Sequence, residues 1–320
     1  MDHALRARGL VKRYPRAPPG TYALSEVDLE IPPGVTFGLI GRNGAGKTTF
    51  VRIAATQLEP TGGQLEVLGF DVREQPREIR TRIACIPQES RPLYFLRTEE
   101  VVYLYLKMRG VDPTDARRRT RDVLSELELE PYRRQLVSNL SGGLRRRALV
   151  AMVFASDAEL LFLDEPTTGL DPLARRQVWE AIRHAIREHR TIVLTTHYLD
   201  EAEALSARLA LIDKGRVMLS GTAEELRARM PYPYRVTIAG PIDPEALRPY
   251  GRVTPVEGGH LVFARETDAR ELARWSLEHG YRLSLGPVSL EDIFLEIVGR
   301  PLIGIEDEEA PEEPVEAPRR

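Results

Sequence analysis

GRNGAGKT, residues 41–48, is the motif from which the fold of this chain can be inferred. It matches the phosphate-loop pattern GxxxxGK[S/T] at every fixed position. The apolar residues 35–40 before it indicate a buried strand, and a helix is expected after Lys47. Glycines let such a loop bend around phosphate oxygens, and the N-terminus of the following helix attracts anions. The stretch therefore predicts a nucleotide-binding α/β domain, with a purely structural glycine turn as the alternative.

The positions of this loop have distinct expected roles. Lys47 is expected to reach the β and γ phosphates of ATP, and the Thr48 hydroxyl to bind Mg²⁺. Thr49 adds a contact to the α-phosphate. The other expected phosphate contacts come from the loop backbone, at Gly41, Asn43, Gly44, Ala45 and Gly46.

A second segment, LLFLDEP at residues 160–166, indicates a catalytic acid pair. Its apolar strand places Asp164 and Glu165 at the carboxyl end of a sheet, the edge at which open α/β sheets bind ligands. Asp164 is expected to hold the Mg²⁺ shell, and Glu165 to orient and deprotonate the attacking water. Taken alone, the pair is equally typical of helix-capping residues.

Further segments predict the rest of this sheet. Residues 82–88 and 191–196 are near-continuously apolar, as are strands of a parallel sheet covered on both faces. A helix is expected just past Pro172, where apolar residues recur with the 3.6-residue period. The segment from about 89 to 155 is mostly helical in pattern and predicts a separate lobe. A hairpin is expected over residues 208–221, turning at Lys214 and Gly215.

The pattern changes after a helix near Thr222–Arg229. Residues 230–300 follow the order strand, helix, strand, strand, helix, strand, which predicts a small ferredoxin-like domain. Ser289 is expected to cap a last helix, LEDIFLEIVG, with Asp292 bonding back. The expected strands are 234–239, 252–255, 260–264 and 281–285, and the expected helices are 244–250 and 268–279.

Composition limits the function classes. The chain has 320 residues, 42% hydrophobic and 29% charged, as in ordinary soluble globular proteins. Its only cysteine, Cys85, excludes an intrachain disulfide and fits a reducing cytoplasm. The charged N-terminus lacks a signal-peptide core, and the longest uncharged apolar stretch in the first half, residues 148–156, is too short to span a bilayer.

Charge is distributed unevenly along the chain. Residues 301–320 carry seven acids and two arginines, a net charge of −5, and are expected to be a disordered tail. Because the whole chain carries −3, residues 1–300 carry +2. A body so near neutrality offers no strong attraction to nucleic acid, so no nucleic-acid partner is expected.

LSGGLRRR, residues 140–147, adds the motif that points to a family. With GRNGAGKTT as Walker A, Gln88, LLFLDEP as Walker B, the D-loop Gly169-Leu170-Asp171 and His197, it resembles the ATP-binding-cassette (ABC) ATPases in collinear order over about residues 5–225. The resemblance implies a P-loop NTPase cassette with a mostly parallel sheet, an antiparallel β part and a helical lobe. The expected domains are 1–229, 230–300 and the tail 301–320.

The resemblance also implies site roles. Ser141, Gly142 and Gly143 of one protomer would cap the ATP bound to a second copy, so that two chains enclose two nucleotides. His197 would contact the γ-phosphate, and Gln88 would sense Mg²⁺ and the attacking water. The D-loop Asp171 would line the nucleotide site. Tyr14 aligns with the adenine-stacking aromatic, although Tyr22 competes for that role and a packed tyrosine is the alternative.

The sequence departs from the family pattern at one signature position. Leu144 stands where the family has glutamine, which predicts weaker contact with the opposite ribose and retained catalysis. The neighbouring Arg145, Arg146 and Arg147 are expected to form a solvated, salt-bridged helix face, with an anion site as the alternative.

The ending SLEDIFLEIVGR and the single cassette resemble the ATPase subunits of ABC-2-type exporters. The expected function is ATP hydrolysis that powers export through a separate membrane permease, with the chain peripheral on the cytoplasmic face of the membrane. It would dock through its helical lobe, around Tyr94, Phe95 and Leu96. An importer subunit, a non-transport ABC ATPase acting on DNA or ribosomes, and an adenylate-type kinase are the alternatives.

Overall fold

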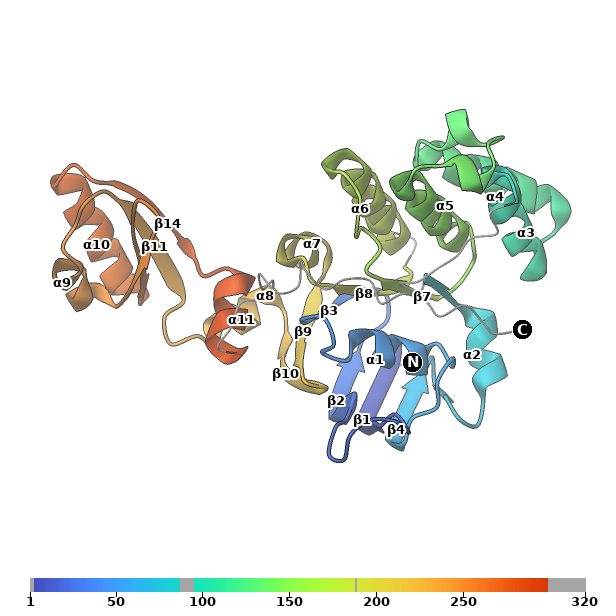
Figure 1. Ribbon diagram of the computed structural model, residues 1–320, viewed down its shortest axis with the longest axis horizontal. Coiled ribbons are helices and arrows are strands. Elements are labelled where there is room, and N and C mark those ends of the chain that lie inside the picture. Colours follow the sequence, from blue (N-terminus) through green and yellow to red (C-terminus); the bar gives the residue numbers. More distant parts are fainter. Residues whose placement is uncertain (1–2, 87–94, 188, 299–320) are drawn as a thin grey trace.

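A computed structural model describes residues 3–86, 95–187 and 189–298. Two sheets and a helical lobe form a cassette, and a smaller α/β domain lies to one side of it (Figure 1). No helix in the described ranges combines the length and apolarity needed to cross a bilayer. The expected tail, residues 301–320, lies outside the described residues.

The central sheet of the cassette has six strands in the order β10-β9-β3-β8-β7-β6. All neighbours are parallel except the hairpin β9–β10. Every residue of β3, β7 and β8 is buried, because helices or the second sheet cover both faces of the sheet. The predicted parallel core and the hairpin are confirmed. The strands are β3 (Thr36–Ile40), β6 (Ile83–Ile86), β7 (Leu160–Asp164), β8 (Thr191–Thr196), β9 (Arg208–Asp213) and β10 (Arg216–Gly221).

A second, antiparallel sheet has the order β2-β1-β4-β5. Helix α1 (Lys47–Ala54) packs between the two sheets, since Phe50 and Ile53 share a buried apolar cluster with Leu65 of one sheet and Phe162 of the other. The helix that begins at the phosphate loop is thereby fixed on both sides. The strands are β1 (Leu5–Lys12), β2 (Leu24–Ile31), β4 (Gly62–Val67) and β5 (Phe70–Asp71), and α2 (Pro76–Arg82) follows them.

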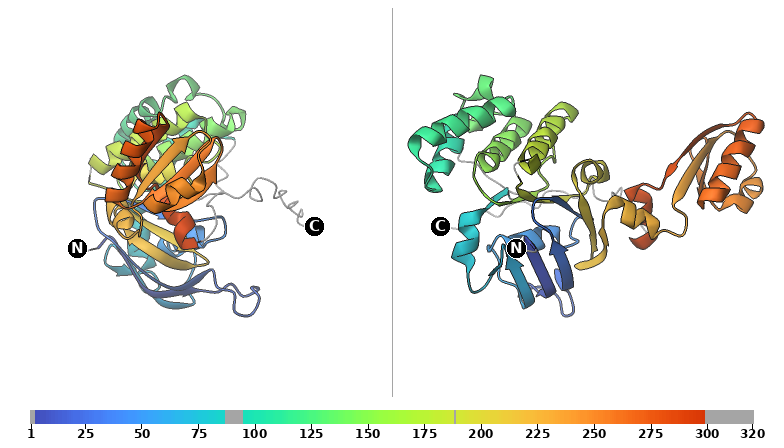
Figure 2. Two further views of the ribbon diagram at one scale, coloured as in Figure 1. Left: turned by 90° about the vertical axis from the view of Figure 1, so that its left-hand side faces the viewer. Right: turned by 180° about the vertical axis from the view of Figure 1, so that it is seen from behind.

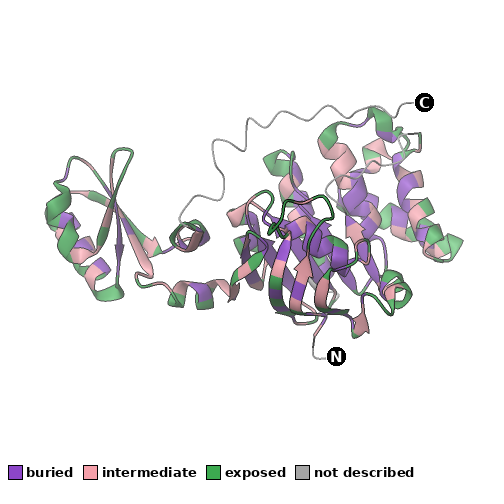
Figure 3. Ribbon diagram, turned by 60° about the horizontal axis from the view of Figure 1, so that its bottom comes forward, coloured by how far each residue is buried: buried purple, intermediate pink, exposed green. Residues whose placement is uncertain are grey.

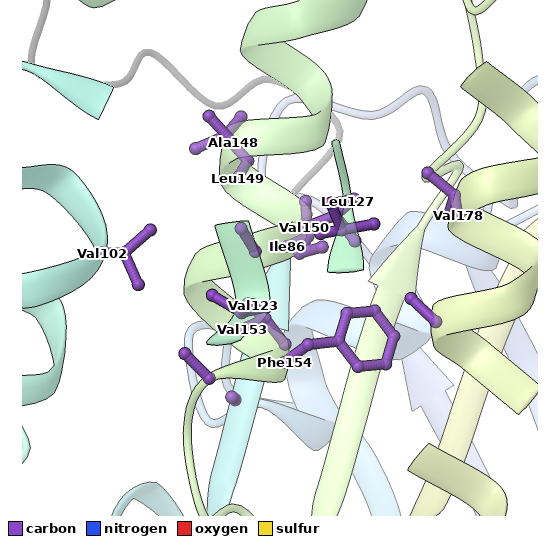
Figure 4. Packing of buried hydrophobic residues seen from close by; sticks show 14 of the residues in the cluster. Ile86, Val102, Val123, Leu127, Ala148, Leu149, Val150, Val153, Phe154 and Val178 are labelled. Atoms are coloured by element: carbon purple, nitrogen blue, oxygen red, sulfur yellow. The ribbon is translucent and has the colours of Figure 1, made fainter. Parts of the chain in front are cut away.

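A helical lobe and α6 (Pro172–Arg187) cover the opposite face of the central sheet, as predicted for the described part of residues 89–155. Figure 4 shows this core: Val102, Val123 and Val153 come from three lobe helices, and Val178 comes from α6. The lobe contains α3 (Thr98–Met108), α4 (Pro113–Glu126), α5 (Gly142–Phe154) and the 3-10 turns η1 (Glu130–Tyr132) and η2 (Val137–Asn139).

The C-terminal domain is a four-stranded antiparallel sheet of order β12-β13-β11-β14, with α9 and α10 beside it. This is the predicted ferredoxin-like arrangement. Its own core pairs Val236, Ile238 and Val262 of the sheet with Leu272 of α10. The elements are β11 (Tyr234–Ala239), α9 (Pro244–Leu247), η3 (Arg248–Tyr250), β12 (Arg252–Val256), β13 (Gly259–Ala264), α10 (Glu266–Glu278) and β14 (Arg282–Pro287).

The last helix, α11 (Leu290–Val298), returns to the cassette (Figure 2). The predicted capping box is present, because Ser289 N donates to Asp292 Oδ2 at 2.8 Å and Asp292 N donates to Ser289 Oγ at 3.2 Å. Ile293 and Phe294 share a buried cluster with Leu211 of β9 and Phe263 of β13. The helix therefore packs against both parts of the molecule, beside α7 (Leu199–Leu205) and α8 (Ala223–Ala228) of the cassette.

Candidate nucleotide-binding and catalytic site

The phosphate loop joins the end of β3 to the start of α1 and has room only for glycine at two positions. A Cβ at Gly41 would lie 2.3 Å from Ile212 O, and one at Gly46 would lie 2.4 Å from Ala23 O. Gly46 also has φ 109°, which L side chains rarely adopt. Because Gly46 caps α1 without a side chain, the first N–H groups of that helix stay available to an anionic ligand.

Lys47 lies buried at the centre of this loop, with 4% of its surface exposed. Its Nζ donates to Gly41 O at 2.6 Å and to Arg42 O at 3.1 Å. The same nitrogen lies 3.5 Å from Glu165 Oε1. The predicted lysine and glutamate are thus in contact, although 118 positions separate them in the chain.

Asp164 ends β7 and faces hydroxyl groups from two other elements. Thr195 Oγ1 on β8 donates to Asp164 Oδ1, and the Thr48 hydroxyl also hydrogen-bonds this carboxylate. Burial raises the pKa of Asp164, and the hydrogen bonds from Thr195 and Thr48 partly offset this rise. A carboxylate and a hydroxyl side by side are the hard oxygen donors that Mg²⁺ prefers, so the residues present fit the expected ion.

Glu165 lies directly after the strand in a left-handed backbone conformation, with φ 49°. Its N–H donates to Thr195 O and to Thr195 Oγ1, both at 3.1 Å, and its Oε1 lies 3.4 Å from His197 Nδ1. Burial acts to raise the pKa of Glu165, but the interactions with His197 and Lys47 outweigh it and lower the pKa. The carboxylate is therefore held ionised beside the phosphate loop, ready to accept a hydrogen bond from water.

The signature segment begins α5 at the surface of the lobe. Ser141 caps the helix, and its Oγ accepts the Leu144 N–H at 3.3 Å. Ser141 and Gly142 are exposed, so a second chain has access to them. Leu144 packs against the apolar core of the helical lobe, which explains how an apolar residue is accommodated where the family has glutamine.

Of the remaining expected site residues, Tyr14 lies beside the start of α1 and Asp171 lies at the start of α6. Tyr14 is partly exposed, and its hydroxyl lies 3.3 Å from Thr49 Oγ1 at the start of α1. This contact favours Tyr14 as the aromatic residue beside the nucleotide. The Asp171 carboxylate caps α6, accepting the N–H groups of Leu173 at 3.0 Å and Ala174 at 2.9 Å. Gln88 lies outside the described residues.

The prediction of a solvated arginine face is wrong for Arg146 and Arg147. Arg147 Nη1 donates to Leu127 O and to the Gln177 side chain, and Arg146 donates to the backbone at the end of β7. Both side chains are only partly exposed.

Thr195 is a site residue that the sequence analysis missed. A threonine within an apolar, β-branched run indicates only a strand, so no local signal pointed to its contact with the acid pair.

This arrangement defines a P-loop nucleoside triphosphatase: a phosphate loop with a buried lysine, an acid pair at the end of β7, and His197 directly after the neighbouring strand β8. The family model described as ABC transporter matches residues 24–168. Over 332 aligned residues and 97% of each chain, the protein is 36% identical to the daunorubicin/doxorubicin resistance ATP-binding protein DrrA of Streptomyces peucetius. It is 35% identical to the Nod factor export ATP-binding protein I of Cupriavidus metallidurans, covering 87% of this chain and 92% of that protein.

The chain therefore belongs to the ATP-binding proteins of ABC transporters, in the group of export ATPases. A solved ATP-binding subunit of an ABC transporter, 27% identical, matches the structure with a TM-score of 0.65 over 71% of this chain and 92% of that one. The protein binds and hydrolyses ATP, and the importer alternative is not favoured.

Proposed function

We propose that two copies of this chain enclose two Mg²⁺–ATP complexes and hydrolyse them to drive export through a separate membrane permease. The observation that carries the proposal is the contact of Glu165 Oε1 with both Lys47 Nζ at 3.5 Å and His197 Nδ1 at 3.4 Å, beside the phosphate loop. Both partners of this carboxylate are groups that can bind a γ-phosphate when the nucleotide enters.

The roles of the residues follow from their chemistry. Lys47 and the N–H groups of the loop bind the phosphates, and Tyr14 stacks on adenine. Thr48 and Asp164 hold Mg²⁺, which neutralises phosphate charge when bound. Glu165 orients the attacking water and accepts its proton, while His197 keeps the carboxylate ionised and contacts the γ-phosphate. Gln88 is proposed as a further Mg²⁺ and water contact.

The second copy supplies the signature. Ser141 caps a 13-residue helix that begins with Gly142 and Gly143, and the N-terminus of this helix suits the γ-phosphate of ATP bound to the partner. The exposure of Ser141 and Gly142 in the single chain supports this assignment. Hydrolysis would remove the γ-phosphate that both chains bind, so the dimer would reopen.

Docking to the permease is proposed to use the helical lobe on the cytoplasmic face of the membrane. Of the three expected docking residues, Phe95 is 71% exposed, whereas Leu96 packs against the core of the lobe and Tyr94 lies outside the described residues. Leu136, also exposed, belongs to the same part of the lobe, because Val137 N donates to Leu96 O at 2.9 Å. Phe95 is therefore kept as a proposed contact with the permease, and Leu136 replaces Leu96.

Affinity purification of the tagged protein from mildly solubilised membranes tests the proposal. An integral membrane protein is expected to co-purify and to crosslink to a photoreactive residue at position 95. Met108, exposed at the far end of α3, provides the matched control position and is expected to give no such crosslink. Recovery only in the soluble fraction, bound to ribosomes or DNA, would contradict export while leaving the ATPase assignment intact.

A further inference from the structure

Arg146 of the signature helix reaches across to the end of strand β7. Its Nη2 donates to Asp164 O at 2.6 Å and to Glu165 O at 2.7 Å, and its Nε donates to Pro166 O at 3.2 Å. One guanidinium group thus contacts three consecutive peptide carbonyls around the acid pair. Five planar N–H donors make arginine suited to holding several acceptors in a fixed arrangement.

These carbonyls flank the point at which the chain leaves β7 in a conformation that glutamate rarely adopts. Glu165 has φ 49°, and such a conformation persists only where the surrounding structure fixes it. Thr195 binds the Glu165 N–H from the neighbouring strand, and Arg146 binds the carbonyls from the helical lobe. The two sets of bonds together fix the backbone from which the Glu165 side chain projects.

The surroundings of Arg146 argue against a surface anion site. Burial lowers the pKa of the guanidinium, and the nearby charges of Asp164, Glu165 and Glu201 partly offset this effect. Three of its hydrogen bonds already go to backbone carbonyls, so these N–H donors serve the backbone and not a bound anion. Ser141 caps the same helix, so Arg146 joins the signature segment to the acid pair of its own chain.

We propose that Arg146 is a positioning residue for ATP hydrolysis, which holds the Asp164–Pro166 backbone so that the Glu165 carboxylate keeps its place beside Lys47 and His197. This inference rests on the proposed role of Glu165 as the base. Loss of the three bonds leaves the phosphate loop unchanged but releases the backbone of the base. The expected consequence is a fall in kcat with little change in nucleotide affinity.

The full-length variants Arg146→Gln and Arg146→Lys test this, with kcat measured by ATPase assay and Kd by a fluorescent ATP analogue. We expect Arg146→Gln to lower kcat by about 10²-fold, the size of effect that a misplaced catalytic group produces, and to leave Kd within about two-fold. Arg146→Lys keeps a charged group that can donate hydrogen bonds, and its kcat is expected to lie between those of the parent and Arg146→Gln. Combining Arg146→Gln with Glu165→Gln should lower the remaining rate no further, because both changes act on the same group.

Arg109 offers a matched control. Its guanidinium also binds two backbone carbonyls, Thr81 O and Ile83 O, both at 2.9 Å, but at the amino end of β6, away from the acid pair. Arg109→Gln is expected to lower the Tm and to leave kcat unchanged. A purely structural role for Arg146 predicts the same result for both arginines.

Each outcome has a distinct meaning. A folded Arg146→Gln variant with parental kcat, or with a loss confined to Kd, would overturn the inference. If that variant does not fold, Arg146→Lys decides the question by the same comparison of kcat with Kd. Parental turnover by Glu165→Gln alone would instead show that the proposed base is wrong, whatever the arginine variants do.

Discussion

The central sheet of the cassette and the sheet of the C-terminal domain use their buried positions differently. In the cassette, the carboxyl edge of the parallel sheet buries Asp164, Glu165, Thr195 and Lys47 of the adjoining loop beneath apolar layers. In the C-terminal domain, the sheet buries aliphatic side chains such as Val236 and Ile238. Buried residues are concentrated in the cassette, whereas the C-terminal domain is mostly coloured as exposed or intermediate (Figure 3). Its charged contacts with α11, Arg235–Asp292 at 3.0 Å and Arg252–Glu296 at 2.5 Å, remain partly exposed.

This difference separates chemistry from packing. Burying charged groups is unfavourable unless they are paired, so a sheet edge that buries several of them marks a site at which charge is used. Partly exposed ion pairs contribute little to stability, and the C-terminal sheet is held mainly by its apolar contacts. Substitutions at the first edge should therefore change rates, and substitutions around α11 should change stability.

Glu165→Gln is expected to have the largest effect. The amide keeps the size of the side chain but cannot accept a proton from water, so turnover should fall by about 10²- to 10⁴-fold, the usual contribution of general-base catalysis. ATP binding should persist, and ATP should trap a dimer that is visible by size-exclusion chromatography. The closing of the dimer and the loss of hydrolysis are measured on the same sample.

The paired control for that variant is Asp200→Asn, an exposed acid on α7 of the same cassette, which should retain parental turnover. If Glu165→Gln hydrolyses ATP at close to the parental rate, the base has been assigned to the wrong residue. Such a result would also remove the reason for the buried cluster around Lys47.

A mixed dimer tests whether the site at the cassette edge is shared between two chains. Lys47→Ala removes the phosphate lysine, and Ser141→Ala removes the signature hydroxyl that the partner's nucleotide is proposed to meet. A dimer with one lesion in each chain should leave one composite site intact, so mixing two inactive proteins should restore part of the ATPase rate. Differently tagged chains, purified in tandem, provide the measurement.

The complementation has clear controls. Each variant mixed with itself should stay inactive, and each must show parental circular dichroism, because Ser141 also caps α5 and its loss costs about 1 kcal/mol. Verified heterodimers with no ATPase rate above that of either variant alone would count against a site shared between two chains.

Much of the fold was predictable because its signals are local. Strands β7 and β8 are near-continuous apolar runs, and the hairpin β9–β10 turns at Lys214 and Gly215, both at positive φ. Strand β1 gave no comparable signal. Register shifts interrupt its pairing with β2 between Ala7 and Leu10, so its two-residue alternation is broken.

The site was predictable where a motif fixes the chemistry and not where a distant residue completes it. Lys47, Glu165 and His197 meet as expected. The contacts of Thr195 with the acid pair and of Arg146 with the same backbone depend on how a neighbouring strand and a lobe helix pack, which no local pattern records. The expected domain boundary near residue 229 likewise gave no indication that α11 packs onto the cassette.

Phe294→Ala is expected to have the smallest effect on chemistry and a clear effect on stability. Phe294 is fully buried between α11, the cassette and the C-terminal sheet, and removing such a ring costs about 3 to 5 kcal/mol. Thermal unfolding should begin at a lower temperature. ATP affinity, measured below the unfolding transition, should stay parental because every motif proposed to contact the nucleotide lies before residue 229. Leu295→Ala, at a neighbouring position that is 44% exposed, should leave unfolding almost unchanged. Loss of ATP binding by folded Phe294→Ala protein would show that α11 shapes the nucleotide site, and the separation between the two sheets would then fail.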